Sequence, residues 1–105
     1  MICRLWRGWT TADNAGAYEA IVRGEVIPGI EGRHIPGFRQ IDLMRRETGD
    51  EIEFATLMWF DSIAAIKAFV GEDHEVAHVP PAARAVLTRF DPRVAHFEVL
   101  DRRPQ

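Results

Sequence analysis

The amino-acid sequence predicts a single α+β domain over residues 1–105, with strands and helices in the order β-α-β-β-α-β. Three observations predict this class. Four short runs have strand composition, two longer stretches place apolar residues at helical spacing, and a Gly-containing loop joins the two middle strands. The order is the split βαβ pattern of a ferredoxin-like sandwich. We therefore expect an antiparallel four-stranded sheet with both helices on one face.

The four strands are expected where β-branched and aromatic residues concentrate. The first run, ICRLWRGWT, contains two Trp, the third run, IEFATLMWF, is the most strand-like, and the last, RVAHFEVL, alternates. The expected strands cover residues 2–10, 38–46, 52–60 and 93–100. Because the loop ETGDE at 47–51 contains a glycine and is short, the second and third strands are predicted to pair as an antiparallel hairpin.

A first helix is expected from residue 12 to about residue 27, where apolar or small residues such as Ala15, Tyr18 and Val22 recur every three or four positions. Asp13 can cap its start, and Pro28 with the glycine after it predicts its end.

A second helix is expected from Ile63, because Asp61-Ser62 supplies an N-cap before an apolar stripe that ends at Gly71. The sequence favours a further helical turn or two within 72–79, before Pro80-Pro81. A small helical piece is expected over 82–87.

The composition excludes several classes of protein. Hydrophobic residues make up 47% and charged residues 28%, as in ordinary globular domains, so disorder is not expected. A net charge of −3 argues against a nucleic-acid partner. No apolar run approaches the roughly 20 residues that span a bilayer. The single cysteine and an N-terminus without an apolar signal segment predict a cytoplasmic location.

The strand pattern predicts a homodimer. Separating residues by parity leaves bulky apolar side chains on both faces of the sheet, and two short helices cover only one face. The uncovered face is therefore expected to pack on a second copy. By this count one face carries Ile2, Trp6, Phe38, Met44, Ile52, Phe54 and Met58, and the other carries Leu5, Trp9, Ile41, Leu43, Leu57, Trp59, Phe97 and Val99.

With this element order, the run FATLMWFDS followed by AAIKAF and EVAH resembles the dimeric α/β-barrel superfamily, and within it the antibiotic biosynthesis monooxygenase-like family. The likeness covers nearly the whole chain. It includes the Pro36-Gly37-Phe38 entry to the second strand, Trp59 at the end of the third, and His78 about twenty residues later. The resemblance implies a two-subunit barrel of facing sheets, with a pocket between sheet and helices in each subunit.

Members of this family include cofactor-independent oxygenases of polycyclic phenols, haem-degrading enzymes and proteins without known activity. The oxygenases use an Asn and a Trp in the pocket, whereas the only Asn here, Asn14, lies at the start of the first helix. In the haem-degrading branch a Trp lies about ten residues before the haem-ligating His. His78 matches that His, but Ala68 stands at the Trp position.

His78 is the candidate catalytic residue, because it follows the second helix where the family opens its pocket and because histidine titrates near neutrality. It could act as a general base, a substrate hydrogen-bond donor or a haem ligand. The structural alternative is a histidine that caps the helix C-terminus.

Arginines in the strands are candidates for orienting an anionic or phenolic group. Arg4, Arg7 and Arg39 qualify, and Arg7 is our choice as a catalytic residue; the alternative for each is a cross-strand ion pair. Trp59, Trp6 and Tyr18 are candidates to bind a flat substrate, and core or dimer packing is the alternative for the tryptophans.

The segment from His74 to His78 matches the zinc motif H-E-x-x-H. That motif needs a continuous helix, and Pro80-Pro81 ends one directly afterwards, so we expect no metal. We also expect no organic cofactor. The sequence thus predicts a monooxygenase-like enzyme acting on a small planar aromatic or phenolic compound, or else a non-catalytic dimeric module that binds a small molecule or haem.

Overall fold

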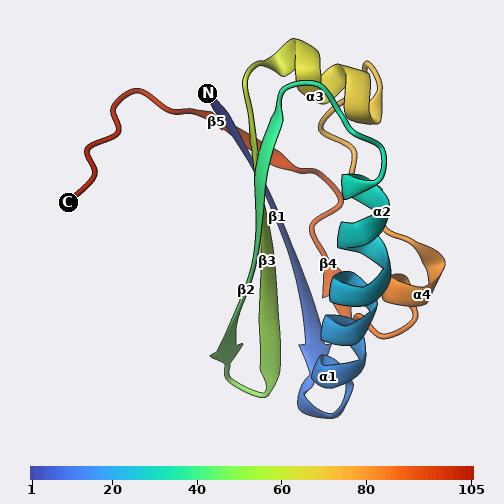
Figure 1. Ribbon diagram of the computed structural model, residues 1–105. Helices are drawn as coiled ribbons and strands as arrows, with labels where there is room; N and C mark the ends of the chain where they lie inside the picture. Colours follow the sequence, from blue (N-terminus) through green and yellow to red (C-terminus); the bar gives the residue numbers. More distant parts are fainter.

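The computed structural model describes all 105 residues and is built from one sheet with its helices on one side. Figure 1 shows the first helical segment running along the sheet and residues 100–105 leading away from the body. The elements, in chain order, are β1 (Ile2–Thr11), α1 (Ala12–Ile21), the π-helical turn η1 (Val22–Val26), α2 (Ile27–Glu31), β2 (Phe38–Thr48), β3 (Glu51–Phe60), α3 (Ile63–Val70), α4 (Pro81–Arg84), β4 (Arg89–Phe90) and β5 (Ala95–Glu98).

The sheet has the order β2-β3-β1-β4, with β5 also pairing with β1, and every pairing is antiparallel. The last strand of the prediction is replaced by β4 and β5, which pair with opposite ends of β1. Residues 93–94 form no strand, and the pairing resumes at Ala95. The α+β class and the ferredoxin-like arrangement are therefore confirmed.

The first helix extends further than predicted. It runs without interruption through α1, η1 and α2 to Glu31, although Pro28 and Gly29 were expected to end it. Pro28 stands in the first turn of α2, directly after the wide π-helical turn, where a missing backbone N–H is tolerated. The cap also differs from the prediction, because Thr11 rather than Asp13 accepts the hydrogen bond from the N–H of Asn14.

The second and third strands form the predicted hairpin, closed at Gly49 and Asp50. A register shift between Phe38 and Gln40 adds one residue to β2. This bulge places Phe38 and Ile41 on the same face of the sheet. The prediction that Ile41 and Leu43 lie on the face opposite Phe38 was therefore wrong. Ile41 and Leu43 pack under the helices, whereas Met44 lies on the opposite face, 43% exposed.

The second predicted helix is confirmed as α3, with Ser62 accepting from the N–H of Ala65 and Gly71 at its end. The extra turns expected over 72–79 do not form. Instead this segment is a loop, tied to the residues before β5 by a bridge between Val76 and Arg93. The helical piece expected over 82–87 is found as α4, one residue earlier at its start and shorter.

The core consists of two separate clusters under the helices. One contains Ala15, Tyr18, Val22, Phe54 and Ala83, and the other contains Met58, Phe60 and Ile66. Because both clusters lie on the helix side of the sheet, the opposite face remains uncovered in the single chain; we refer to it as the open face. None of the helices is long and apolar enough to cross a membrane.

Candidate functional site

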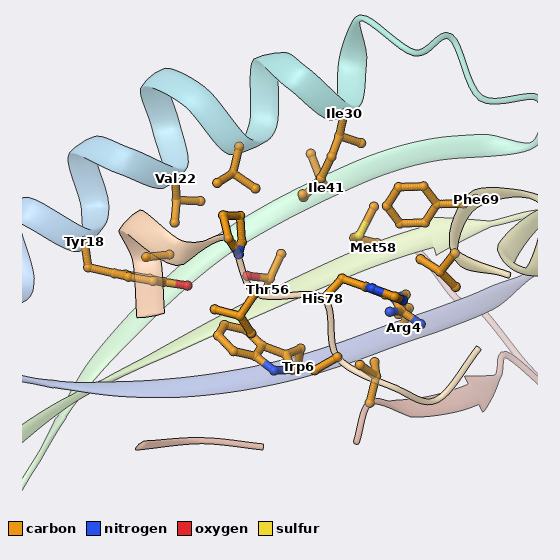
Figure 2. Close-up of a pocket in the computed structure, with 17 residues that line it drawn as sticks. Arg4, Trp6, Tyr18, Val22, Ile30, Ile41, Thr56, Met58, Phe69 and His78 are labelled. Carbon is orange, nitrogen blue, oxygen red and sulfur yellow. The ribbon is translucent and has the colours of Figure 1, made fainter. Parts of the chain in front are cut away.

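A cavity of about 120 Å³ lies between the sheet and the helices, and 17 residues line it. Its floor comes from β1, β2 and β3, its roof from α1, η1 and α2, and its sides from α3, α4 and the loop before α4. Figure 2 shows these walls converging from segments far apart in the sequence. Thirteen of the lining residues are hydrophobic, so the cavity offers a mostly apolar space.

The cavity exists because the two core clusters do not meet. Thr56 lies between Phe54 and Met58 on the helix face of β3, and both of these neighbours are almost fully buried. Thr56 itself is only half-buried, because it faces the cavity rather than a packed side chain. Above it the roof is formed by the short side chains of Val22 and Val26, which bound the π-helical turn.

Four candidate residues from the sequence line the cavity: Tyr18, Trp6, His78 and Arg4. The Tyr18 ring packs on Phe54 with ring centroids 4.7 Å apart, and burial raises the pKa of its hydroxyl to about 12. Figure 2 shows this hydroxyl at one end of the cavity, directed into it.

Trp6 and His78 contribute in different ways. The indole Nε1 of Trp6 donates to the carbonyl of Asp91 at 2.9 Å, so its polar atom is already satisfied and its ring forms part of the apolar wall. His78 belongs to the loop between α3 and α4 and its side chain is exposed, which makes it a residue of the cavity rim. Since the loop separates it from α3, it does not cap that helix.

Two other predicted residues lie outside the cavity. Arg7 points to the open face, where it pairs with Asp91 at 3.0 Å and covers the ring of Trp9. Trp59 also lies on the open face; its Nε1 donates to Asp42, and Arg102 stacks on its ring. Arg7 and Trp6 could not both face the cavity, because adjacent residues of a strand point to opposite faces of the sheet.

Arg4 is the arginine that reaches the cavity. It is 6% exposed, and its Nη1 donates to the carbonyl of His74 at 2.6 Å and to Nε2 of His96 at 2.9 Å. No carboxylate lies within ion-pairing distance of Arg4, so its buried positive charge has no counter-ion. Burial lowers the pKa of Arg4 to about 10, which leaves the guanidinium charged at neutral pH.

His96 supports Arg4 from β5 and was missed as a site residue. Burial and the nearby Arg4 charge lower the pKa of His96 to about 4, so the ring is neutral and its Nε2 can accept from the arginine. Its Nδ1 is buried without a partner. The pairing of Arg4 with His96 follows from the register of β1 and β5, which only the folded chain establishes.

The motif from His74 to His78 does not form a helical zinc site. The segment is a loop, and His74 faces His96, with ring centroids 5.0 Å apart. Glu75 pairs with Arg93 at 2.9 Å. No group of three histidine, cysteine or acidic side chains is arranged to hold a metal ion.

Solved structures with the same fold cover almost the whole chain. A Bacillus cereus protein assigned as an antibiotic biosynthesis monooxygenase superposes with a TM-score of 0.72 at 15% identity, over 100% of this chain and 96% of that one. SnoaB, a cofactor-independent oxygenase from Streptomyces nogalater, has a TM-score of 0.59 at 19% identity, over 99% and 98% of the two chains. No protein-family model and no curated protein matches the sequence.

The haem degrader MhuD from Mycobacterium tuberculosis, with two haems bound in its active site, superposes with a TM-score of 0.60 at 19% identity, over 99% of this chain and 100% of that one. The chain therefore has the ferredoxin-like fold of the antibiotic biosynthesis monooxygenase-like proteins, as its sequence resemblance predicts. Identities this low establish the fold and leave the activity to the residues of the site.

Proposed function

We propose that the protein is a cofactor-independent, monooxygenase-like enzyme that takes a small planar aromatic or phenolic compound into the cavity between sheet and helices. The cavity is the observation that carries the proposal, because a packed core of this size has no structural need for an apolar gap at its centre. The likeness to SnoaB, a cofactor-independent oxygenase, supports the reaction class.

The size of the cavity favours a substrate with one ring. An engineered apolar cavity of roughly 150 Å³ in another protein binds benzene, and the volume here is about 120 Å³. Drug-sized ligands occupy pockets of roughly 300–1,000 Å³. A polycyclic compound would require the loop over residues 72–79 to move outwards.

In the proposed reaction His78 removes the proton of a ring hydroxyl, which makes the ring electron-rich enough to react with dioxygen. One oxygen atom enters the ring and the other leaves as water, so a phenol with a free ring position becomes a quinone. Dioxygen is the oxidant and no cofactor takes part. Trp6 and Tyr18 hold the ring, since both contribute flat apolar surface to the cavity.

The test is oxygen consumption by the purified protein with single-ring phenols and no added cofactor. His78→Ala is expected to lower turnover at least about tenfold, which is roughly 1.4 kcal/mol. It is expected to change the melting temperature by only a few degrees, because the side chain is exposed. His34→Asn is the matched control, since His34 is an exposed histidine just after a turn and asparagine tolerates its positive φ of 48°. If His78→Ala turns over phenols as fast as the wild type, His78 is not the base.

A homodimer through the open face completes the proposal. Phe97 is 55% exposed and Met44 43%, and Leu5, Leu57 and Trp59 are only half-buried on the same face of the single chain. Light scattering at micromolar concentration is expected to give twice 11.9 kDa. Leu57→Glu is expected to shift the mass toward the monomer, because it places a charge in the centre of the proposed interface. A wild-type monomer would refute this part.

The second candidate is a non-catalytic dimer that binds a small molecule or haem. MhuD, with two haems in its active site, and the position of His78 at the cavity rim favour the haem form. Haem is too large for the cavity as it stands, so this form also requires the loop to open. Titration with haemin distinguishes the candidates: a Soret band that is lost in His78→Ala supports haem, and its absence favours the smaller ligand.

A further inference from the structure

The guanidinium of Arg4 has an unused edge. An arginine side chain has five N–H donors, and the two on Nη1 serve His74 and His96. Neither Nε nor Nη2 has an acceptor in the protein. Only two side-chain polar atoms are both fully shielded and without a partner, Thr10 Oγ1 and His96 Nδ1. Nε and Nη2 of Arg4 are not among them, so these atoms remain accessible, and Arg4 lines the cavity.

The surroundings of Arg4 orient this edge without neutralising it. Both of its acceptors are uncharged, since one is a carbonyl and the other a neutral imidazole. The two acidic residues that flank His74, Asp73 and Glu75, are both paired with Arg93. A buried charge without a counter-ion is costly, whereas a hydrophobic residue at the same place is often neutral or stabilising. The cost is understandable if an anion completes the site.

We propose that Nε and Nη2 of Arg4 bind the carboxylate of a small aromatic acid whose ring fills the apolar part of the cavity. The inference rests on the proposed function and gives its substrate class: a one-ring phenol that also carries a carboxylate. The Nε–Nη2 edge presents parallel donors that match the two oxygens of a carboxylate. A neutral phenol has a single oxygen and brings no charge to balance that of the arginine.

Figure 2 shows how such a ligand lies. Arg4 and Tyr18 are at opposite ends of the cavity, with Thr56 and Met58 between them. A carboxylate at Arg4 directs the ring along the floor toward Tyr18, whose hydroxyl then faces the far side of the ring. A substituent with a hydrogen-bond acceptor at that position would be favoured.

Benzoate and benzamide test the inference, because they have nearly the same shape and differ in charge. We expect benzoate to bind the wild-type protein at least about tenfold more tightly than benzamide, measured by calorimetry at neutral pH. Binding should also shift the NMR signal of the Trp6 indole N–H, which locates the ligand in the cavity. This comparison needs no variant, so it does not depend on how a mutant folds.

Two variants and a matched control complete the test. Arg4→Met is expected to lose at least about tenfold in benzoate affinity while keeping the affinity for benzamide. Arg4→Lys keeps the positive charge but lacks the paired N–H donors of the guanidinium. Its benzoate affinity is expected to lie between those of the wild type and Arg4→Met. Arg7→Met is the control, because Arg7 lies on the same strand and points to the open face. It is expected to bind benzoate as the wild type does.

The outcomes separate this inference from the proposed function. Equal binding of benzoate and benzamide with a shifted Trp6 signal would overturn the carboxylate site and leave the aromatic cavity intact. If neither compound binds up to about 10 mM, weaker than roughly −3 kcal/mol, the carboxylate site and the cavity proposal both fail. Benzoate affinity that is lost in Arg7→Met and kept in Arg4→Met would assign the binding to the open face and overturn the inference.

Discussion

Filling the cavity should stabilise the protein and abolish ligand binding. The cavity of about 120 Å³ has room for a larger side chain at Thr56, which faces it. Thr56→Ile replaces a hydroxyl that has no protein partner with an ethyl group directed into this space. Since a buried methylene contributes about 0.8 kcal/mol, we expect a gain of about 1 kcal/mol, or roughly 4–8 °C in melting temperature.

The same substitution at Thr10 is the matched control. Thr10 lies on the helix face of β1, is fully buried and does not line the cavity. Extra carbon atoms there meet packed neighbours and cost about 1–3 kcal/mol, but the change also removes a hydroxyl that is buried without a partner, which offsets part of that cost. Thr10→Ile is therefore expected to lack the gain of Thr56→Ile, and because isoleucine suits a strand at both positions, the difference isolates the effect of the empty volume.

Urea and thermal unfolding at one protein concentration measure both variants, because the proposed dimer would make the melting temperature depend on concentration. Calorimetry with benzoate measures the second consequence, a loss of at least about tenfold in Thr56→Ile. The reasoning is refuted if Thr56→Ile gains no stability over Thr10→Ile, or if it leaves benzoate affinity unchanged. Either result would mean that the space beside Thr56 is not available in solution.

Two further predictions concern stability. The pKa of His96 is lowered to about 4 from 6.5, so the unfolded chain takes up the proton first and stability falls as the pH drops below 6.5. We expect a loss of about 1–2 kcal/mol between pH 7 and pH 5, measured by urea unfolding and largely absent in His96→Gln; an unchanged slope in that variant would assign the effect to other groups. Gly37→Ala is expected to cost about 2 kcal/mol or more, because Gly37 has a φ of 84° and an added Cβ would lie 2.9 Å from that of Ala65. Gly49→Ala is expected to cost about 1 kcal/mol, since φ is 61° and the space around it is open; equal losses would contradict the close approach at Gly37.

The candidate site shows why sequence reasoning found some residues and missed others. Tyr18 and Trp6 were found because each is an aromatic residue in an element whose buried face can be inferred from its own pattern. The preference for Arg7 over Arg4 ignored the alternation that the same strand imposes, and counting from Trp6 would have corrected it. His96 carried no such signal, because its role depends on which residue of β1 lies opposite it.

The sequence by itself determined the order of the elements, the hairpin between β2 and β3, and the limits of α3. Each of these depends on residues close together in the chain: a turn glycine, a capping serine, or an apolar stripe at a fixed period. Local patterns of this kind survive in any tertiary context that buries the same face.

Only the tertiary structure decided the register, the helix end and the site. The bulge after Phe38 changed which side chains of β2 face the helices, and the π-helical turn carried the first helix past Pro28. The cavity and the uncompensated charge of Arg4 depend on the space left between elements far apart in the sequence. Such space is a property of packing in three dimensions, so no pattern along the chain encodes it directly.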